Sequence, residues 1–272
     1  MDDDVPLGSW SIGPDLRERM RLDGIRAALH EGRLDEAVLE AEEFLDSQPT
    51  HTEALSLLGE ALLSGGDAEL ALHTFRVVAQ RLDGEPSVEL LYRLGLAAFE
   101  TCDLADALVH LREVVRRAPD HADAHFTLGM LYELRDQGDD GPRATQAFEA
   151  ARALDPEVYP PPMELEPSVL VTALKEAISH LQPELAQVLA GVPVTLVERP
   201  DLGELRRATP PLPPTVVALL DGDPGDHPET LAPPSGLRIF TATLARYPTF
   251  DDVVGALVDA LSVESADWLG LT

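Results

Sequence analysis

The stretch TEALSLLGEALLSGGDAELALHTFRVVAQRL, residues 52–82, decides the fold of the first part of this chain. It contains two helical segments, Thr52–Ser64 and Ala68–Leu82, on either side of a glycine-rich turn. Small residues recur around it at a nearly constant period. The pairs 34 residues apart are Gly32 with Gly66, Ala37 with Ala71 and Gly95 with Gly129, and those 36 apart are Gly59 with Gly95 and Ala71 with Ala107. This period predicts stacked helical hairpins.

Four such hairpins can be placed along residues 15–156. Their expected helices are Asp15–His30 with Leu34–Asp46, Thr52–Ser64 with Ala68–Leu82, Ser87–Thr101 with Leu104–Ala118, and Ala122–Arg135 with Pro142–Leu154. A glycine on the first helix and an alanine on the second allow two helices to approach closely. The prolines Pro49, Pro119 and Pro156 end three of the second helices, because proline has no N–H to continue the helix.

These residues resemble the tetratricopeptide repeat. The second unit matches at Gly59, Ala71 and Phe75, and the fourth at Gly129, Tyr132, Ala144, Phe148, Ala151 and Pro156, with three extra residues in its turn. The first unit has Ile25 in place of the glycine, which is typical of an N-terminal cap.

The resemblance implies a concave groove lined by the first helices. The family's groove positions correspond here to Glu53, Ser56, Glu60, Glu89, Tyr92, Leu96, Phe99, Asp123, Phe126, Met130 and Glu133. Acidic residues alternate there with aromatic and apolar ones, which favours a protein or peptide partner that is basic and has apolar anchors. The alternative, which has equal weight, is that the aromatic residues only pack against neighbouring helices.

Composition excludes several classes of function. The net charge of −29 opposes binding to nucleic acid and to anionic membranes, because both are negatively charged. Cys102 is the only cysteine, so neither an internal disulfide nor a cysteine-cluster zinc site is possible. Residues 1–14 lack the pattern of a signal peptide, and we expect a cytoplasmic protein with this stretch as an N-terminal extension.

The helical period ends at a proline-rich linker, residues 157–165, and a different domain, residues 166–272, follows it. Helices are expected at Pro167–Leu181, Pro183–Leu189 and Phe250–Leu261, with a short one near Glu264–Leu269. Strands are expected at Val192–Glu198, Thr215–Leu220 and Leu237–Ala245. The expected fold is therefore an α-helical solenoid of about four hairpins followed by a small α+β domain.

The order of these elements resembles the small zincin-like metallopeptidase domain of bacteria. The stretches that carry the resemblance are Ala173–Ile178, Leu181–Leu185, Gly191–Glu198, Leu212–Gly222 and Leu237–Phe240. The family's last long helix carries His-Glu-x-x-His, but here Gly255, Ala256 and Asp259 occupy those positions. Without the two imidazoles and the glutamate, the domain has no means of binding zinc or activating water. The resemblance thus implies a pseudo-peptidase with no metal and no cofactor.

Other candidate sites are weaker still. His121 and His125 are one helical turn apart, but the motif HADAH lacks the glutamate of a zinc peptidase. His227 lies in a turn context, GDHP, where a catalytic role is not favoured. We therefore expect no catalytic residues.

The leading hypothesis from sequence is a non-catalytic interaction or scaffold protein. The first alternative is a metal-dependent peptidase with non-standard ligands, namely Asp259, Glu264 and His227. The second is that the C-terminal domain only caps the open end of the solenoid.

Overall fold

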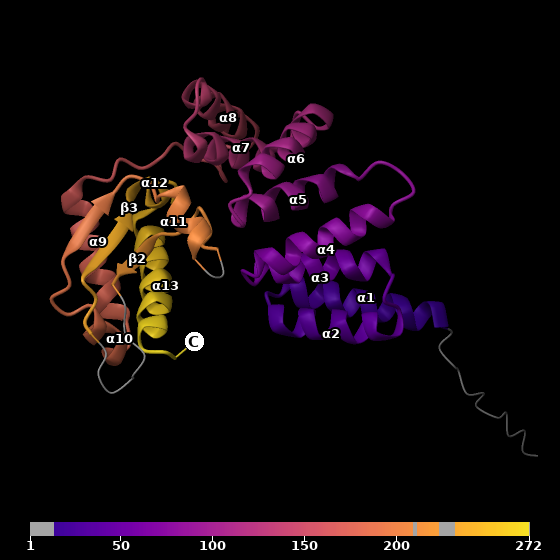
Figure 1. Ribbon diagram of the computed structural model, residues 1–272, viewed down its shortest axis with the longest axis horizontal. Coiled ribbons are helices and arrows are strands. Elements are labelled where there is room, and N and C mark those ends of the chain that lie inside the picture. The colour runs from indigo at the N-terminus through magenta and orange to yellow at the C-terminus, as the bar shows by residue number, and fades with distance from the viewer. Residues whose placement is uncertain (1–13, 209–210, 223–231, 272) are drawn as a thin grey trace, which may run out of the picture. The chain divides into compact units, whose positions relative to one another are not determined.

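The computed structural model describes residues 14–208, 211–222 and 232–271 (Figure 1). The chain divides into two compact units between Ala98 and Phe99. Each unit is described separately below. The expected domain boundaries at residues 157 and 166 stay a prediction.

The first unit consists of helical hairpins. Its helices are α1 (Pro14–His30), α2 (Leu34–Ser47), α3 (Thr52–Ser64), α4 (Ala68–Arg81) and most of α5 (Val88–Glu100). The turns use backbone conformations that favour glycine, with φ of 71° at Gly32 and 90° at Gly66. The side chain of Asp67 accepts a hydrogen bond from Leu70 N at 3.2 Å and so starts α4. These bounds agree with the expected helices to within one residue at each end.

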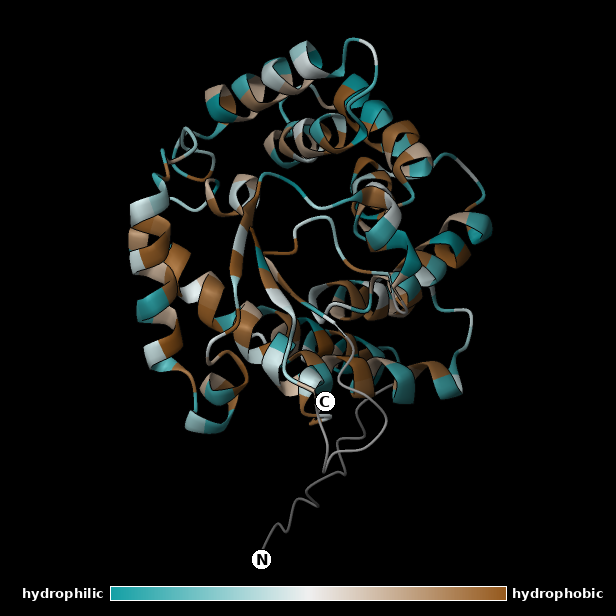
Figure 2. Cartoon of the chain, turned by 60° about the vertical axis from the view of Figure 1, so that its left-hand side comes forward, coloured by the Kyte–Doolittle hydropathy of each residue, from teal (hydrophilic) through white to brown (hydrophobic). Residues whose placement is uncertain are grey.

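The small residues lie where the two helices of a hairpin cross. A β-carbon added at Gly59 would come within 2.6 Å of the Phe75 ring, and one at Gly129 within 2.6 Å of the Phe148 ring. The reciprocal alanines are buried, namely Ala37, Ala71, Ala107 and Ala144. Figure 2 shows hydrophilic and hydrophobic residues alternating along the helices.

The second unit continues the array with α6 (Leu104–Arg117), α7 (Ala122–Arg135) and α8 (Asp140–Leu154). The extra residues between α7 and α8 have a clear structural role. The Arg135 guanidinium donates to both carboxylate oxygens of Asp140, at 2.7 and 2.6 Å, and Gln137 N donates to the same carboxylate at 3.1 Å. Asp140 is fully buried, and its hydrogen bond with Arg135 lowers the pKa of its carboxyl group. The longer turn is therefore fixed by a buried ion pair.

The remainder of the second unit is an α+β region. Its elements in chain order are α9 (Pro167–His180), α10 (Pro183–Val188), β1 (Val194–Val197), α11 (Leu202–Arg207), β2 (Ala218–Asp221), β3 (Gly236–Phe240), α12 (Thr241–Leu244) and α13 (Phe250–Trp268). In the described residues the sheet has the strand order β1-β3-β2. Strand β1 is parallel to β3, with Val194 beside Leu237, and β2 is antiparallel to β3, with Leu220 beside Leu237.

Several details differ from the sequence expectation, and one is that β2 begins at Ala218 rather than at the expected Thr215. The expected strand Leu237–Ala245 ends at Phe240, because Thr241–Leu244 turns into α12. The expected terminal helix is not separate, since α13 runs unbroken from Phe250 to Trp268. Helix α11 was not expected, although Asp201 is a good N-cap that accepts a hydrogen bond from Glu204 N at 2.8 Å.

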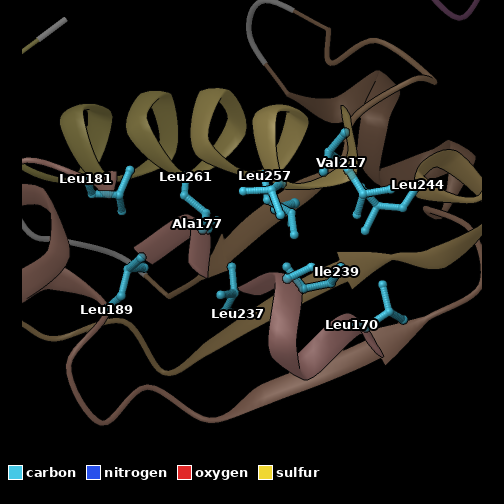
Figure 3. Packing of buried hydrophobic residues seen from close by; sticks show 14 residues of the cluster. Leu170, Ala177, Leu181, Leu189, Val217, Leu237, Ile239, Leu244, Leu257 and Leu261 are labelled. Atoms are coloured by element: carbon cyan, nitrogen blue, oxygen red, sulfur yellow. The ribbon is translucent and has the colours of Figure 1, made fainter. Parts of the chain in front are cut away.

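The core of the α+β region lies between the sheet and two helices. Figure 3 shows Leu237 and Ile239 of β3 facing Leu257 and Leu261 of α13, with residues of α9 alongside. Each of these four side chains is at most 2% exposed. Burial of such side chains contributes roughly 1.5–3 kcal/mol each to the free energy of unfolding. The apolar contacts therefore account for the pairing of α13 with the sheet.

One arginine joins three elements at the other side of the sheet. The Arg238 guanidinium donates to Glu204 of α11 at 2.7 and 2.5 Å, and to Asp221 of β2 at 2.7 Å. The hydrogen bond from Arg238 lowers the pKa of the Glu204 carboxyl group. This network holds the short helix α11 against the strands.

Among the described residues, no helix combines the length and apolarity that crossing a bilayer requires.

The hairpin crossing makes a direct prediction about stability. We expect Gly59→Ala to lower the free energy of unfolding by about 1–3 kcal/mol, because the added methyl group collides with the Phe75 ring. The matched control is Gly255→Ala in α13, where nothing lies within 4 Å of an added β-carbon. This control should raise the free energy of unfolding by up to about 1 kcal/mol, since alanine is the better helix former. Urea denaturation measures both, and equal effects would contradict the close crossing.

Candidate functional site

The groove positions of the first unit are partly neutralised by arginines of the array itself. The Glu53 carboxylate pairs with Arg26, and Arg93 pairs with both Glu60 and Glu89. Ser56 donates its hydroxyl to Thr52 O at 2.8 Å. Tyr92 and Leu96 are half-buried. The acidic character expected for this groove is therefore reduced, because each glutamate already has a cationic partner.

Phe99 is buried, and the Phe126 ring is partly covered by other rings of the chain. Phe99 is 1% exposed, so its assignment as an exposed groove residue was wrong, and its ring belongs to the core. The Phe126 ring lies 5.4 Å from that of Phe148 and 4.6 Å from that of Tyr159, measured between centroids. Tyr159, in the proline-rich linker, also donates its hydroxyl to the Asp123 carboxylate. The chain's own linker thus covers part of the α7 groove face.

The next turns of α7 are contacted by residues that follow the strands. The Arg246 guanidinium donates to the Glu133 carboxylate at 2.5 Å, and Arg199 lies 3.7 Å from its other oxygen. Burial lowers the pKa of Arg246 despite this pairing. Met130, one turn earlier, is half-buried. The four groove positions of α7 were expected to meet a partner, and at least three of them contact the same polypeptide.

Between these contacts lies a cavity of about 780 Å³. Its apolar and aromatic lining comes from α7, α8, the linker and the segment after β3, namely Phe126, Met130, Phe148, Val158, Tyr159, Pro160, Pro162, Leu165, Ala242, Ala245 and Tyr247. Its charged lining consists of Glu133, Glu149, Arg152, Glu198, Arg199 and Arg246. Mostly apolar walls with a few polar groups are typical of a binding pocket.

The degenerate metal-site positions lie on α13. Gly255 and Asp259 are exposed, and Ala256 is half-buried. Asp259 acts electrostatically on Tyr247, which contributes, after burial, to the raised pKa of that phenol. Within the described ranges, no three His, Cys, Asp or Glu side chains are arranged to hold a metal ion.

The other proposed ligands have structural partners or fall outside the described residues. Glu264 accepts a hydrogen bond from Leu220 N at 2.7 Å, and burial raises the pKa of its carboxyl group. His121 Nδ1 accepts from Ala124 N at 3.3 Å at the start of α7, and His125 Nε2 lies 2.9 Å from Pro119 O. His227 lies outside the described residues.

Sequence reasoning missed a buried carboxyl group at the end of α5. Burial raises the pKa of Glu100 to about 7, and Thr215 donates its hydroxyl to it at 3.5 Å. Nearby, Arg206 donates to Cys102 O at 3.0 and 2.8 Å. Burial also raises the pKa of the Cys102 thiol to about 11, so this cysteine is no nucleophile at neutral pH. Glu100 has no motif around it, and only its contact with a loop more than a hundred residues away gives it this environment.

Comparison with known proteins confirms the repeat assignment. Residues 22–86 and 92–159 match the tetratricopeptide repeat family. Two similar solved structures are MamA from Desulfovibrio magneticus RS-1 (26% identity over 54% of this chain and 80% of that chain, TM-score 0.44) and MamA of MSR-1 (23%, 52% and 79%, TM-score 0.44). No curated protein matches the chain. The helices of residues 22–159 therefore form a tetratricopeptide-repeat array, and a small α+β region follows them in the chain.

The buried carboxyl group makes stability depend on pH. Because the folded-state pKa of Glu100 is raised from 4.5 to about 7, the folded state binds this proton more tightly than the unfolded state. Relative to high pH, proton binding by Glu100 contributes fully to the free energy of unfolding below pH 4.5, and this contribution is lost as the pH rises through 7. Glu100→Gln should therefore stabilise the protein increasingly between pH 5 and pH 8, by up to about 3 kcal/mol. Urea denaturation at both values measures this, and a constant difference would contradict it.

The ion pair between α7 and the segment after β3 gives a second prediction. Glu133→Ala should lower the free energy of unfolding by about 1–3 kcal/mol, because Arg246, which is largely buried, would lose its hydrogen-bonding partner. The control is Glu113→Ala, which removes surface pairs with Arg116 and Arg117 of the same helix and should cost clearly less. Adding Arg246→Met to Glu133→Ala should recover most of the loss. Equal costs in urea denaturation for the two alanine variants would contradict a buried pair.

Proposed function

We propose that this chain is a non-catalytic scaffold protein whose tetratricopeptide repeats bind a peptide segment of a protein partner. The observation that carries the proposal is the cavity on the α7 and α8 side of the array. Phe126, Met130 and Glu133 are among both the expected groove residues and the residues that line the cavity.

The size and chemistry of the cavity support a short peptide segment rather than a whole protein surface. Its volume of about 780 Å³ suits a few amino-acid side chains. The stacked rings of Phe126 and Tyr159, and the edge contact of Phe126 with Phe148, supply rigid aromatic walls for an apolar anchor. An apolar side chain placed against these rings in the cavity would lose contact with water, which is the main source of affinity at such anchors.

The charged residues of the cavity favour a partner with mixed polarity. Arg246 and Arg199 are paired with Glu133 and Glu198, so they add little net charge. Glu149 is exposed at the cavity and forms no ion pair among the described residues. The preference for basic residues next to an apolar anchor stays a prediction, supported by the net charge of −29.

For the α+β region we propose a structural and docking role. Its residues Arg199, Thr215 and Arg246 contact α5 and α7, so it closes one side of the cavity. No finding supports the zincin-like resemblance, which stays an interpretation of the sequence. Nothing specific favours a peptidase with non-standard ligands, because Glu264 is engaged by the backbone of β2. A cytoplasmic location also stays a prediction.

A pair of matched valines tests the cavity. Val158 lines it and is 61% exposed, while Val109 of α6 is 65% exposed and lies outside its lining. Peptides would be selected on the wild-type protein from a phage-displayed library, and their affinities measured by fluorescence polarisation. We expect Val158→Lys to weaken binding about tenfold or more, because it places a charge at the apolar wall. Val109→Lys should leave the affinity unchanged.

Two results would overturn the proposal. One is that the library yields no peptide that binds the full chain. The other is that the selected peptides bind Val158→Lys and Val109→Lys with equal affinity while both variants keep the wild-type thermal transition.

A further inference from the structure

The two edge strands of the described sheet differ in what covers their outer main-chain groups. In the order β1-β3-β2, the outer strands are β1 and β2, and each has one row of main-chain groups that β3 does not engage. Such unpaired N–H and C=O groups are a template for another strand unless something covers them. The contacts of the two edges therefore show which one is available.

The β2 edge is blocked by a side chain. Leu220 N points away from β3 and donates to Glu264 Oε2 of α13 at 2.7 Å. Burial raises the pKa of this carboxyl group, and the hydrogen bond from Leu220 opposes that rise. Helix α13 thus occupies the place where a further strand would pair with β2.

The β1 edge has no such cover within the described residues. Leu237 N donates to Pro193 O at 2.9 Å, and Val194 is the register partner of Leu237. In a parallel ladder with this register, Pro193, Thr195 and Val197 direct their main-chain groups toward β3. Val194 and Leu196 therefore direct theirs outward, to the open edge of the sheet.

The side chains of the same two residues are also uncovered. Register partners in a sheet lie on the same face, so Val194 shares a face with Leu237, and Leu196 shares it with Ile239. Leu237 and Ile239 are 1% and 2% exposed, whereas Val194 and Leu196 are 44% and 39% exposed. The helical layer buries this face at β3 but leaves it open at β1. The uncovered side chains of Val194 and Leu196 therefore form an apolar surface, here called the apolar step, beside the unpaired edge.

We propose that β1 is a docking edge for an extended segment of a partner protein, which adds a strand next to Val194–Val197. The outward N–H and C=O groups of Val194 and Leu196 supply the main-chain hydrogen bonds. Alternate apolar side chains of the partner cover the two exposed side chains, as strand addition requires. Residues Val194–Val197 do not line the cavity, although Glu198 after them does, and the inference does not depend on the proposed function.

Charge determines the kind of partner. Glu198 and Asp201, which follow β1, are paired with Arg199 and Arg207, so the charge that a partner meets is chiefly that of the chain as a whole, which is −29. A second copy of this chain would bring the same negative charge to the edge, so self-pairing is opposed by repulsion. An extended segment with apolar residues at alternate positions and basic residues at its ends meets both the apolar step and the acidic surroundings.

The test uses the full chain and a synthetic peptide, Lys-Lys-Val-Thr-Val-Thr-Val-Lys-Lys, capped at both ends. Hydrogen exchange of the Val194 and Leu196 amides, followed by NMR, should slow by about tenfold or more at saturating peptide. A control peptide with its five central main-chain nitrogens methylated should give no protection, because it cannot pair with an edge. An analogue with glutamate in place of lysine should bind about tenfold more weakly.

Two protein variants separate edge pairing from other modes of binding. Leu196→Pro removes an outward N–H without touching the ladder to β3, and it should abolish peptide binding while the thermal transition is kept. If that variant does not fold, Leu196→Lys should repel the basic peptide at the same edge. Thr172→Lys, at an exposed position of α9, is the matched charge control and should bind normally.

Several outcomes would overturn the proposal. They are the absence of amide protection by the basic peptide, equal binding of the methylated peptide, and unchanged binding by both Leu196 variants. Protection of the same amides in the protein alone, together with a dimer in sedimentation velocity, would make a second copy the occupant and would also refute a heterologous partner.

Discussion

The close crossing of two helices within each hairpin is the constraint on which the repeat array depends. At Gly59 and Gly129 the partner helix places a phenylalanine ring where any β-carbon would collide with it. This distance sets how the two helices of a hairpin lie, and the buried alanines on the second helices allow the same approach from the other side. The groove positions on α7 lie beside this crossing, because Phe126, one turn before Gly129, contacts the same Phe148 ring that packs on Gly129 and lines the cavity.

The helices of the array were predictable because their signals are local. Periodic small residues, glycine turns and capping residues such as Asp67 and Asp103 each act within a few positions of the chain. The environment of the groove was not predictable in the same way. Arg246 and Glu133 are 113 residues apart, and the sequence around neither residue predicts that they form an ion pair. The same holds for Tyr159, which was visible only as part of a proline-rich linker, and for Phe99, which is 1% exposed although the repeat pattern predicts a groove residue there.

The strand prediction failed for a related reason. Residues 237–245 were expected to form one strand, but the backbone leaves the sheet after Phe240 and forms α12. Just after α12, Ala245 O accepts a hydrogen bond from Met163 N of the linker at 2.7 Å. This places Arg246 and Tyr247 at the cavity rather than at the end of a strand. A tertiary contact therefore decided an element boundary that local propensity had placed five residues later.

The long helix α13 was compared, from its sequence, with the metal-binding helix of a peptidase, whereas its contacts in the structure are those of a helix that packs on the sheet. Its exposed positions Gly255 and Asp259 carry no ligand-forming imidazole, and its buried residues Leu257 and Leu261 pack on β3. Glu264, which the peptidase alternative required as a ligand, instead accepts the free N–H of β2. The hydrogen bond from Leu220 N holds the Glu264 carboxylate at the edge of the sheet. Moving this carboxylate to a metal ion would leave Leu220 N unpaired, at a cost of about 1–3 kcal/mol. The helix is thus explained by the sheet it covers, and the strand edge that it leaves open is β1.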